Sequence, residues 1–110
     1  MNFELLCWML GAHFIGDMAL QSQWVAELKA KRFYILLSHC IIWTVCVCIP
    51  LKLSGLPPER LGAAAIFLLS GHVLIDSWKS KKPKDDAHWH LIYIDQSLHF
   101  LQILFIWFFN

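Results

Sequence analysis

Four apolar stretches of about 20 residues each occupy almost the whole chain, and they constrain its fold more than any other feature. A helix that crosses the ~30 Å hydrocarbon core of a bilayer needs about 20 predominantly apolar residues. The connections between the stretches are short, which places neighbouring helices antiparallel. The sequence therefore predicts an all-α polytopic membrane protein with a single domain, residues 1–110, that folds as an antiparallel four-transmembrane-helix bundle. The predicted spans are residues 5–26, 33–51, 61–78 and 90–109.

The composition agrees with burial of most of the chain in lipid. Hydrophobic residues make up 58% of the 110 residues and charged residues only 15%, whereas a soluble domain is about 45–50% apolar and about 25% charged. The first residues lack the basic segment and cleavage site of a secretory signal peptide, so the first span is expected to remain in the protein. Basic residues are not interleaved with aromatic ones, and no glycine-rich phosphate loop occurs, so no nucleic-acid partner is expected.

Basic residues are concentrated in the first and third connections. The second connection contains only Lys52 and Arg60. Cytoplasmic loops of membrane proteins carry an excess of Lys and Arg. Loops one and three are therefore predicted to be cytoplasmic, with both termini on the opposite side of the membrane. The basic residues of these two loops are Lys29, Lys31, Arg32, Lys79, Lys81, Lys82 and Lys84.

Three of the spans carry a histidine and an aspartate four residues apart, a spacing that places both on one face of a helix. The order is reversed in the last span, as it must be if that helix runs antiparallel to the third and presents both side chains at the same depths. At ~1.5 Å per residue, the aspartates form a shallow layer near the cytoplasmic ends, and the histidines a layer about one turn deeper. The pairs are His13 with Asp17, His72 with Asp76, and His99 with Asp95; His39 of the second span reaches the aspartate layer.

Charged groups at these positions need compensation, because each costs about 2.5–3.5 kcal/mol at the centre of a membrane helix on insertion scales. Carboxylate oxygens and imidazole nitrogens together suit zinc, manganese or iron, and the helices of a bundle can supply such ligands. We therefore interpret the cluster as a divalent-metal site with enough ligands for two ions. The alternative is that the same residues form hydrogen bonds that hold the helices together. The predicted metal ligands are His13, Asp17, His39, His72, Asp76, Asp95 and His99, and the three aspartates are also the predicted catalytic residues.

Three further polar residues continue the same helix faces. Gln21 lies four residues beyond the first aspartate, Lys79 lies three beyond the second, and Gln96 is adjacent to the third. They are predicted to support the ligands or to contact a substrate. Lys79 lies at a helix end, where it can either meet a phosphate or extend to the membrane interface.

The arrangement resembles a family of small bacterial and phage integral membrane proteins grouped as domain of unknown function 3307. Their spans carry H-x-x-G-D-x-x-x-Q in the first helix, H-x-x-x-D-x-x-K in mid-chain and D-Q-x-x-H near the end. The resemblance covers nearly the whole chain, includes His39 and implies the bacterial inner (cytoplasmic) membrane, but it brings no established activity. The matching residues are His13, Gly16, Asp17, Gln21, His72, Asp76, Lys79, Asp95, Gln96 and His99.

The histidine and aspartate pairs alone are also similar to those of proteins described as inner-membrane metal-dependent hydrolases, which favours metal chemistry and implies no substrate. Three functions stay open. The first is an enzyme in which a metal ion activates water and one carboxylate acts as general base, so that a lipid or phosphoester is hydrolysed. The second is an ion or proton transporter or a channel subunit. The third is a structural or interaction protein. The expected partners are membrane lipids, and a homo-oligomer is an alternative to the monomer.

Overall fold

A computed structural model describes residues 2–82 and 86–109, and every regular element within these ranges is helical. The predicted all-α class is thus confirmed. Lys84, which contributes to the predicted charge of the third connection, lies outside the described residues. The elements are α1 (Phe3–Phe14), the π-helix η1 (Ile15–Ala19), α2 (Gln23–Leu28), α3 (Phe33–Leu53), α4 (Pro58–Ser80), the 3₁₀-helix η2 (Asp86–His88) and α5 (His90–Phe108).

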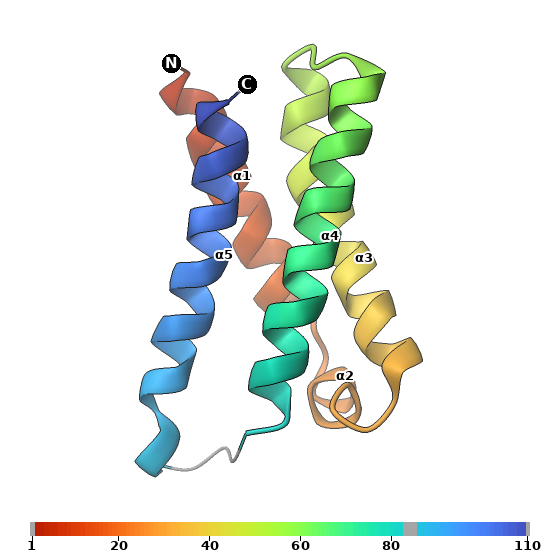
Figure 1. Ribbon diagram of the computed structural model, residues 1–110, viewed down its shortest axis with the longest axis vertical. Coiled ribbons are helices and arrows are strands. Elements are labelled where there is room, and N and C mark those ends of the chain that lie inside the picture. Colours follow the sequence, from red (N-terminus) through yellow and green to blue (C-terminus); the bar gives the residue numbers. More distant parts are fainter. Residues whose placement is uncertain (1, 83–85, 110) are drawn as a thin grey trace.

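The long helices form a bundle in which α3 and α5 each pack against both α1 and α4. In Figure 1, α1 begins and α5 ends at the end of the bundle where both chain termini lie, whereas α2 lies at the opposite end. The described part of the chain is 41 Å long. This length matches a bilayer of about 40–45 Å when the headgroup regions are included.

Three helices, α3, α4 and α5, are long and apolar enough to cross a membrane. The first predicted span, 5–26, is divided into parts. The helix of α1 and η1 ends at Ala19 after 12 and five residues, about 25 Å at ~1.5 Å per residue. A new helix, α2, then starts where the Ser22 hydroxyl accepts a hydrogen bond from the Val25 amide at 3.2 Å. The polar residues Gln21, Ser22 and Gln23 end the apolar run here, because a serine at an N-cap favours a helix start.

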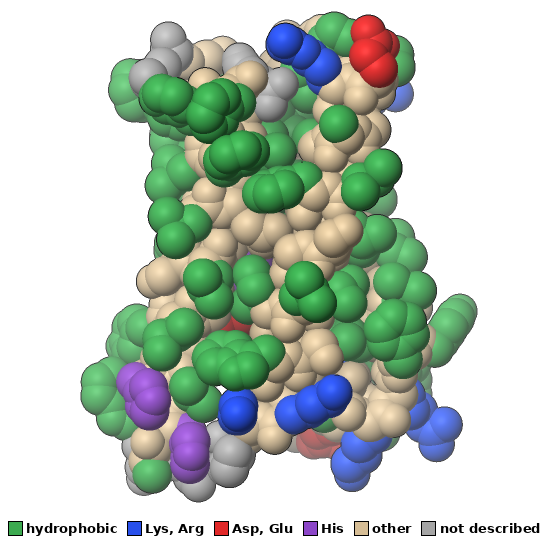
Figure 2. Space-filling model, viewed as in Figure 1, with side chains coloured by type: hydrophobic (Ala, Val, Ile, Leu, Met, Phe, Trp, Pro, Cys, Tyr) green, Lys and Arg blue, Asp and Glu red, His purple; other side chains and the backbone are tan. Residues whose placement is uncertain are grey.

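The outer surface of the bundle is apolar and its interior contains the ionisable groups. Large hydrophobic side chains on all three long helices are exposed, for example Val45 at 55%, Leu74 at 72% and Leu101 at 61%. Figure 2 shows such side chains over most of one face, with Lys and Arg gathered at its two ends. Soluble proteins rarely expose contiguous apolar surface of this extent. The distribution is that of a protein surrounded by lipid.

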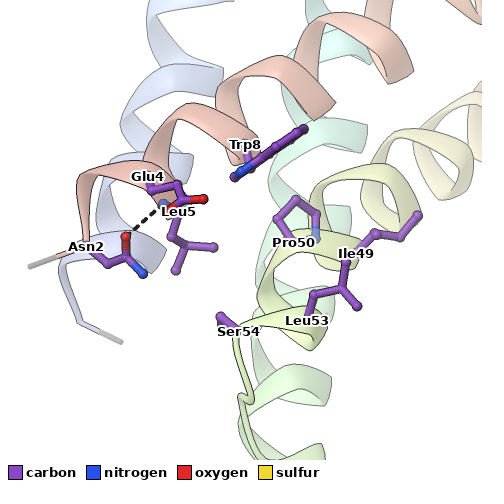
Figure 3. Close-up of a pocket in the computed structure, with 8 residues that line it drawn as sticks. All are labelled: Asn2, Glu4, Leu5, Trp8, Ile49, Pro50, Leu53 and Ser54. Carbon is purple, nitrogen blue, oxygen red and sulfur yellow. Dashed lines mark hydrogen bonds between the residues drawn. The ribbon is translucent and has the colours of Figure 1, made fainter.

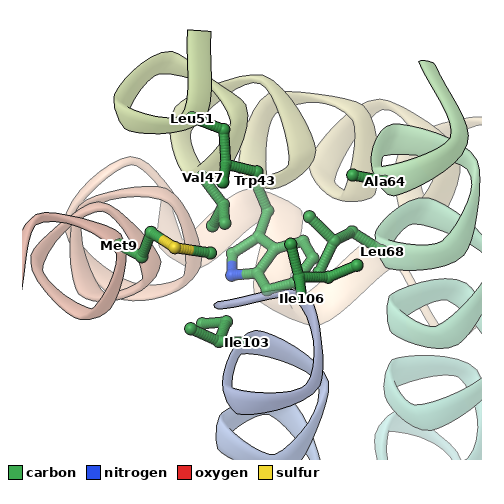
Figure 4. Close-up of a cluster of buried hydrophobic side chains, with 8 residues drawn as sticks. All are labelled: Met9, Trp43, Val47, Leu51, Ala64, Leu68, Ile103 and Ile106. Atoms are coloured by element: carbon green, nitrogen blue, oxygen red, sulfur yellow. The ribbon is translucent and has the colours of Figure 1, made fainter. Parts of the chain in front are cut away.

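An apolar core fills the half of the bundle nearer the chain termini (Figure 4). Trp43 forms the boundary between this core and the polar residues. Its indole ring is fully buried and stacks on the His72 ring at a centroid distance of 4.2 Å. The core therefore closes the polar cluster on that side. Its residues are Met9, Trp43, Val47, Leu51, Ala64, Leu68, Ile103 and Ile106.

Gly16 allows η1 to approach α3 closely. A Cβ atom at this position would lie 2.9 Å from the Cα atom of Trp43 and 3.3 Å from the Cβ atom of Cys46. Small residues permit such backbone contact in membranes, where lipid gives little hydrophobic drive for helices to associate. The contact brings the next residue, Asp17, to α3. The close approach of α3 thus explains why a glycine, and no larger residue, precedes Asp17.

Replacing Gly16 with alanine is expected to force η1 and α3 apart and to lower the free energy of unfolding by about 1–3 kcal/mol, the usual cost of overpacking. Gly11→Ala is the matched control, because a Cβ atom at Gly11 would meet nothing within 4 Å. That substitution should be neutral or stabilise the helix by about 0.5–1 kcal/mol. Thermal unfolding in detergent measures both. Equal stability of the two variants would show that the approach at Gly16 is not tight.

Candidate functional site

The structure brings all seven predicted ligands into one buried cluster in the half of the bundle that contains α2. None of the seven exposes more than 7% of its surface. Each of the four packed segments contributes, so the cluster exists only when the bundle is assembled. η1 and α1 supply Asp17 and His13, α3 supplies His39, α4 supplies His72 and Asp76, and α5 supplies Asp95 and His99.

The first group of atoms converges from η1, α3 and α4. His39 Nε2 lies 3.2 Å from Asp17 Oδ1 and 3.4 Å from Asp76 Oδ2. His72 Nε2 lies 3.3 Å from His39 Nε2, 3.7 Å from Asp17 Oδ1 and 4.0 Å from Asp76 Oδ2. Two imidazole N–H groups cannot point at each other, so at least one of the facing Nε2 atoms has its lone pair directed into the group. His39 Nε2 and His72 Nε2 thus each lie within 4.0 Å of one oxygen of Asp17 and one oxygen of Asp76.

A second group lies on the α5 side of Asp17. His99 Nδ1 is 3.7 Å from Asp95 Oδ1 and 3.9 Å from Asp17 Oδ2. Among the described residues, His99 Nδ1, His99 Nε2 and Asp95 Oδ1 are buried without a hydrogen-bond partner. Asp17 faces both groups, with Oδ1 toward His39 and Oδ2 toward His99. Buried polar atoms of this kind are costly to leave unsatisfied, so they call for an explanation.

His13 is engaged differently from the other histidines. Its Nδ1 atom accepts a hydrogen bond of 2.9 Å from Nε1 of Trp43. An indole N–H can only donate, so His13 Nδ1 carries no proton. The other ring nitrogen, Nε2, therefore carries the proton and donates to Oε1 of Gln96 at 2.7 Å. Both nitrogens of His13 are occupied, so in this arrangement it orients Gln96 and offers no lone pair to a metal.

Gln96 connects the aspartates of two helices. Its Nε2 atom donates to Asp17 Oδ2 at 3.1 Å and to Asp95 Oδ2 at 2.9 Å. The bond from His13 fixes the orientation of the Gln96 amide, so that the amide nitrogen faces both carboxylates. Lys79, which is 29% exposed, places Nζ 3.6 Å from Asp95 Oδ2. Both residues thus contact carboxylates of the cluster.

Lys29 is the most important member of the cluster that the sequence analysis does not identify. It is only 8% exposed. Its Nζ atom donates to both oxygens of Asp76, at 2.8 and 2.9 Å, and to Oε1 of Gln21 at 2.7 Å. From the sequence alone, Lys29 is predicted to be one of the basic residues of the first, cytoplasmic loop. The break after Ala19 turns the chain so that α2 carries Lys29 back to the bundle.

Two sequence signals point to the residues that were missed. The polar run from Gln21 to Gln23 interrupts an apolar span and marks the helix break that redirects Lys29. Trp43 lies in the middle of α3, four residues beyond His39, although tryptophans of membrane proteins are enriched at the interfaces. A tryptophan at that depth needs a partner for its N–H group when buried. His13 is that partner.

The residues of the cluster occur in the same order and spacing as the motifs described above, and a family comparison extends this agreement to nearly the full length. The profile of the proteins of unknown function DUF3307 matches residues 5–110. The chain belongs to this family. No curated protein and no solved structure gives a significant match to it. For this DUF3307 protein, function must therefore be argued from the site itself.

A surface pocket of this DUF3307 protein lies away from the cluster, between α1 and α3 at the end of the bundle with the termini (Figure 3). Trp8, Ile49, Pro50 and Leu53 give it a mainly apolar lining, and none of its lining residues belongs to the cluster. The chemistry of the family motif is elsewhere.

The ion pair between Lys29 and Asp76 can be tested by substitution in the absence of metal. Lys29→Met keeps the aliphatic stem but leaves the charge of Asp76 buried without its partner, which is expected to cost about 3–5 kcal/mol of unfolding free energy. Addition of Asp76→Asn should restore part of this loss, so the two changes should be non-additive. Chemical unfolding in detergent with a chelator present measures the effect.

Lys31→Met is the control, because Lys31 belongs to the same segment and is exposed. Its effect should remain within about 0.5 kcal/mol. Equal stability of the Lys29 and Lys31 variants would contradict a required ion pair at Asp76.

Proposed function

We propose that this DUF3307 protein binds a divalent metal ion at Asp17, His39, His72 and Asp76 and uses it to hydrolyse a lipid or another phosphoester at the membrane surface. The observation that carries the proposal is the spacing of four donor atoms. Ligands at the usual 2.0–2.1 Å from a tetrahedral ion lie about 3.3–3.4 Å from one another. The five separations that involve His39 Nε2 or His72 Nε2 range here from 3.2 to 4.0 Å.

The types of donor also support a metal. Two imidazoles and two carboxylates suit zinc, manganese or iron more than magnesium or calcium, which prefer oxygen ligands alone. Lys29 and Gln96 donate hydrogen bonds to the carboxylates Asp76 and Asp17. Ligating carboxylates are commonly held by such outer partners, which orient them toward the ion. A purely structural network would not need two imidazole nitrogens to face each other.

The charges of the cluster favour an anionic substrate once an ion is bound. Three carboxylates and the ammonium groups of Lys29 and Lys79 give a net charge of −1 with neutral histidines. One divalent ion changes this charge to +1. A cationic site at a lipid headgroup layer attracts a phosphate. Lys79 is the candidate to contact that phosphate, because it is partly exposed beside Asp95.

The roles of the protein residues follow from their contacts. A bound divalent ion lowers the pKa of a coordinated water and polarises a phosphoryl oxygen. His39, His72, Asp17 and Asp76 would hold the ion. Asp95 lies in the second group, next to His99, and its Oδ1 atom makes no hydrogen bond among the described residues, so with one ion bound it would be the candidate general base. Trp43 and the apolar core exclude water from the other side.

The end of the bundle with the cluster is proposed to face the cytoplasm across the bacterial inner membrane. Six described basic residues surround this end, whereas the opposite end has Lys52 and Arg60. Figure 2 shows a small area of acidic side chain between hydrophobic side chains on this face, above the Lys and Arg side chains at that end. The six residues are Lys29, Lys31, Arg32, Lys79, Lys81 and Lys82.

The orientation is tested by fusing alkaline phosphatase, an enzyme that is active only outside the cytoplasm, to the C-terminus. The fusion should be active, and an inactive fusion would show that the orientation is the reverse.

The apolar core counts against transport through a single chain. Beyond the histidines, the centre of the bundle is filled by Met9, Val47, Leu68 and Ile103, all 0% exposed. An ion or proton path needs polar groups along its length. A transporter or channel would therefore have to form between copies of a homo-oligomer. A structural role remains the alternative if no metal binds.

Metal content is the first test. Protein purified in detergent and reconstituted with zinc, manganese or iron should hold metal, and His39→Ala and Asp17→Asn should reduce its affinity at least tenfold, as expected for loss of a ligand or its close partner. His90→Ala is the control, because His90 is exposed at the start of α5. Elemental mass spectrometry measures the content, and circular dichroism verifies the fold. Wild-type protein that takes up no metal would overturn the proposal.

Hydrolysis is tested on the metal-loaded protein in vesicles of phosphatidylglycerol that contain phosphatidic acid. Release of inorganic phosphate should depend on metal, be lost in Asp17→Asn and persist in His90→Ala. Aryl phosphate monoesters and diesters extend the test to soluble substrates. A metal-loaded protein that hydrolyses none of these probes would overturn the enzyme and leave the metal site in place.

A further inference from the structure

The second group of the cluster remains unexplained when one ion occupies the first. His99 is 0% exposed and neither of its ring nitrogens has a hydrogen-bond partner among the described residues. Asp95 Oδ1, 3.7 Å away, is also without one. A buried hydrogen-bonding group without a partner costs about 1–3 kcal/mol. Two of these atoms, His99 Nδ1 and Asp95 Oδ1, lie near each other, too far apart for a hydrogen bond, which indicates that a ligand occupies the space between them.

Asp17 connects this space to the first group. Its Oδ1 atom lies 3.2 Å from His39 and 3.7 Å from His72, whereas its Oδ2 atom lies 3.9 Å from His99. A carboxylate whose two oxygens face different sets of donors has the arrangement of a bridge between two ions. In two-metal sites of hydrolytic enzymes the ions lie about 3.5–4 Å apart.

We infer that a second divalent ion binds at Asp95, His99 and Oδ2 of Asp17, and that Asp17 bridges it to the first ion. This inference rests on the proposed metal site and extends it to a dinuclear centre. The separations from His99 Nδ1 to Asp95 Oδ1 and to Asp17 Oδ2, 3.7 and 3.9 Å, exceed the edge of about 3.3–3.4 Å for a tetrahedral ion. Binding therefore draws α5 and η1 slightly together.

The two sites differ in the number of protein ligands. The first has four potential donors, which is the number of a closed tetrahedral site. The second has three, and sites with three protein ligands keep a position for water or substrate. With both ions bound, the second ion would therefore hold the reactive water and Asp95 would be its ligand; with the first ion alone, the water would have to join as a fifth ligand and Asp95 would be free to act as base. Lys79, 3.6 Å from Asp95, stands beside this position.

The charge of a dinuclear centre defines the class of substrate. Two divalent ions change the net charge of the cluster from −1 to +3. A metal-bound hydroxide and a phosphate group with two negative charges together would neutralise it. A phosphomonoester is therefore a better match than a neutral ester, because a neutral ester would leave excess positive charge next to lipid.

The test counts manganese ions and detects their coupling. Metal-free protein titrated with Mn²⁺ should bind two ions per chain, and electron paramagnetic resonance should show the exchange-coupled signal of two bridged ions. His99→Ala and the isosteric Asp95→Asn should each bind one ion and give the six-line signal of isolated Mn²⁺. His90→Ala should behave as the wild type. Two variants are used so that a folding defect in one does not decide the result.

The outcomes separate this inference from the proposed function. One ion in the wild type, retained in His99→Ala, would overturn the second ion and leave the first site intact. Two ions in His99→Ala would place the second ion elsewhere and overturn the inference. Two uncoupled ions in the wild type would overturn the Asp17 bridge. No ion in any protein would overturn the proposed function as well.

Discussion

Burial of three carboxylates inside a bundle surrounded by lipid is the constraint on which the rest of the structure depends. Asp17, Asp76 and Asp95 are each at most 7% exposed, and an ionised group in such surroundings needs a partner of opposite charge or several hydrogen bonds. The structure meets this demand for Asp76 with Lys29, and for the other two in part with Gln96. The helix break after Ala19 serves the same demand, because a continuous helix would carry Lys29 away from Asp76. The break in the helix and the neutralisation of a buried carboxylate are thus linked.

Close packing makes the polar layer compatible with the apolar half of the bundle. Gly16 brings η1 against Trp43, and Trp43 in turn presents its N–H to His13 and its ring face to His72. One side chain thereby satisfies a histidine and separates ionisable groups from the apolar core. The π-helix η1 lies at this contact, and single turns of π-helix often occur at functional sites because they redirect the side chains that follow.

The sequence predicted the helices and the polar layer because both depend on local spacing. A separation of four residues fixes a common helix face, and distance from the helix end fixes depth, so His72, Asp76, Asp95 and His99 were identified together. The position of Lys29 does not follow from such rules. It depends on a turn of the chain that brings Lys29 to Asp76, and spacing along a helix contains no information on that contact. The hydrogen bond from Trp43 to His13 is likewise a contact between separate helices.

The three histidine and aspartate pairs look equivalent in the sequence, yet the structure gives them different chemistry. His13 has both ring nitrogens in hydrogen bonds to Trp43 and Gln96, and so it serves to orient the amide between two aspartates. His72 presents one nitrogen to His39 and the first pair of carboxylates, and His99 has neither nitrogen engaged. The number of ring nitrogens without a hydrogen bond among the described residues thus rises from none in His13 to one in His72 and two in His99. Because a metal binds through lone pairs, this order, and not the repeated spacing, decides which residues can hold an ion and which only position its neighbours.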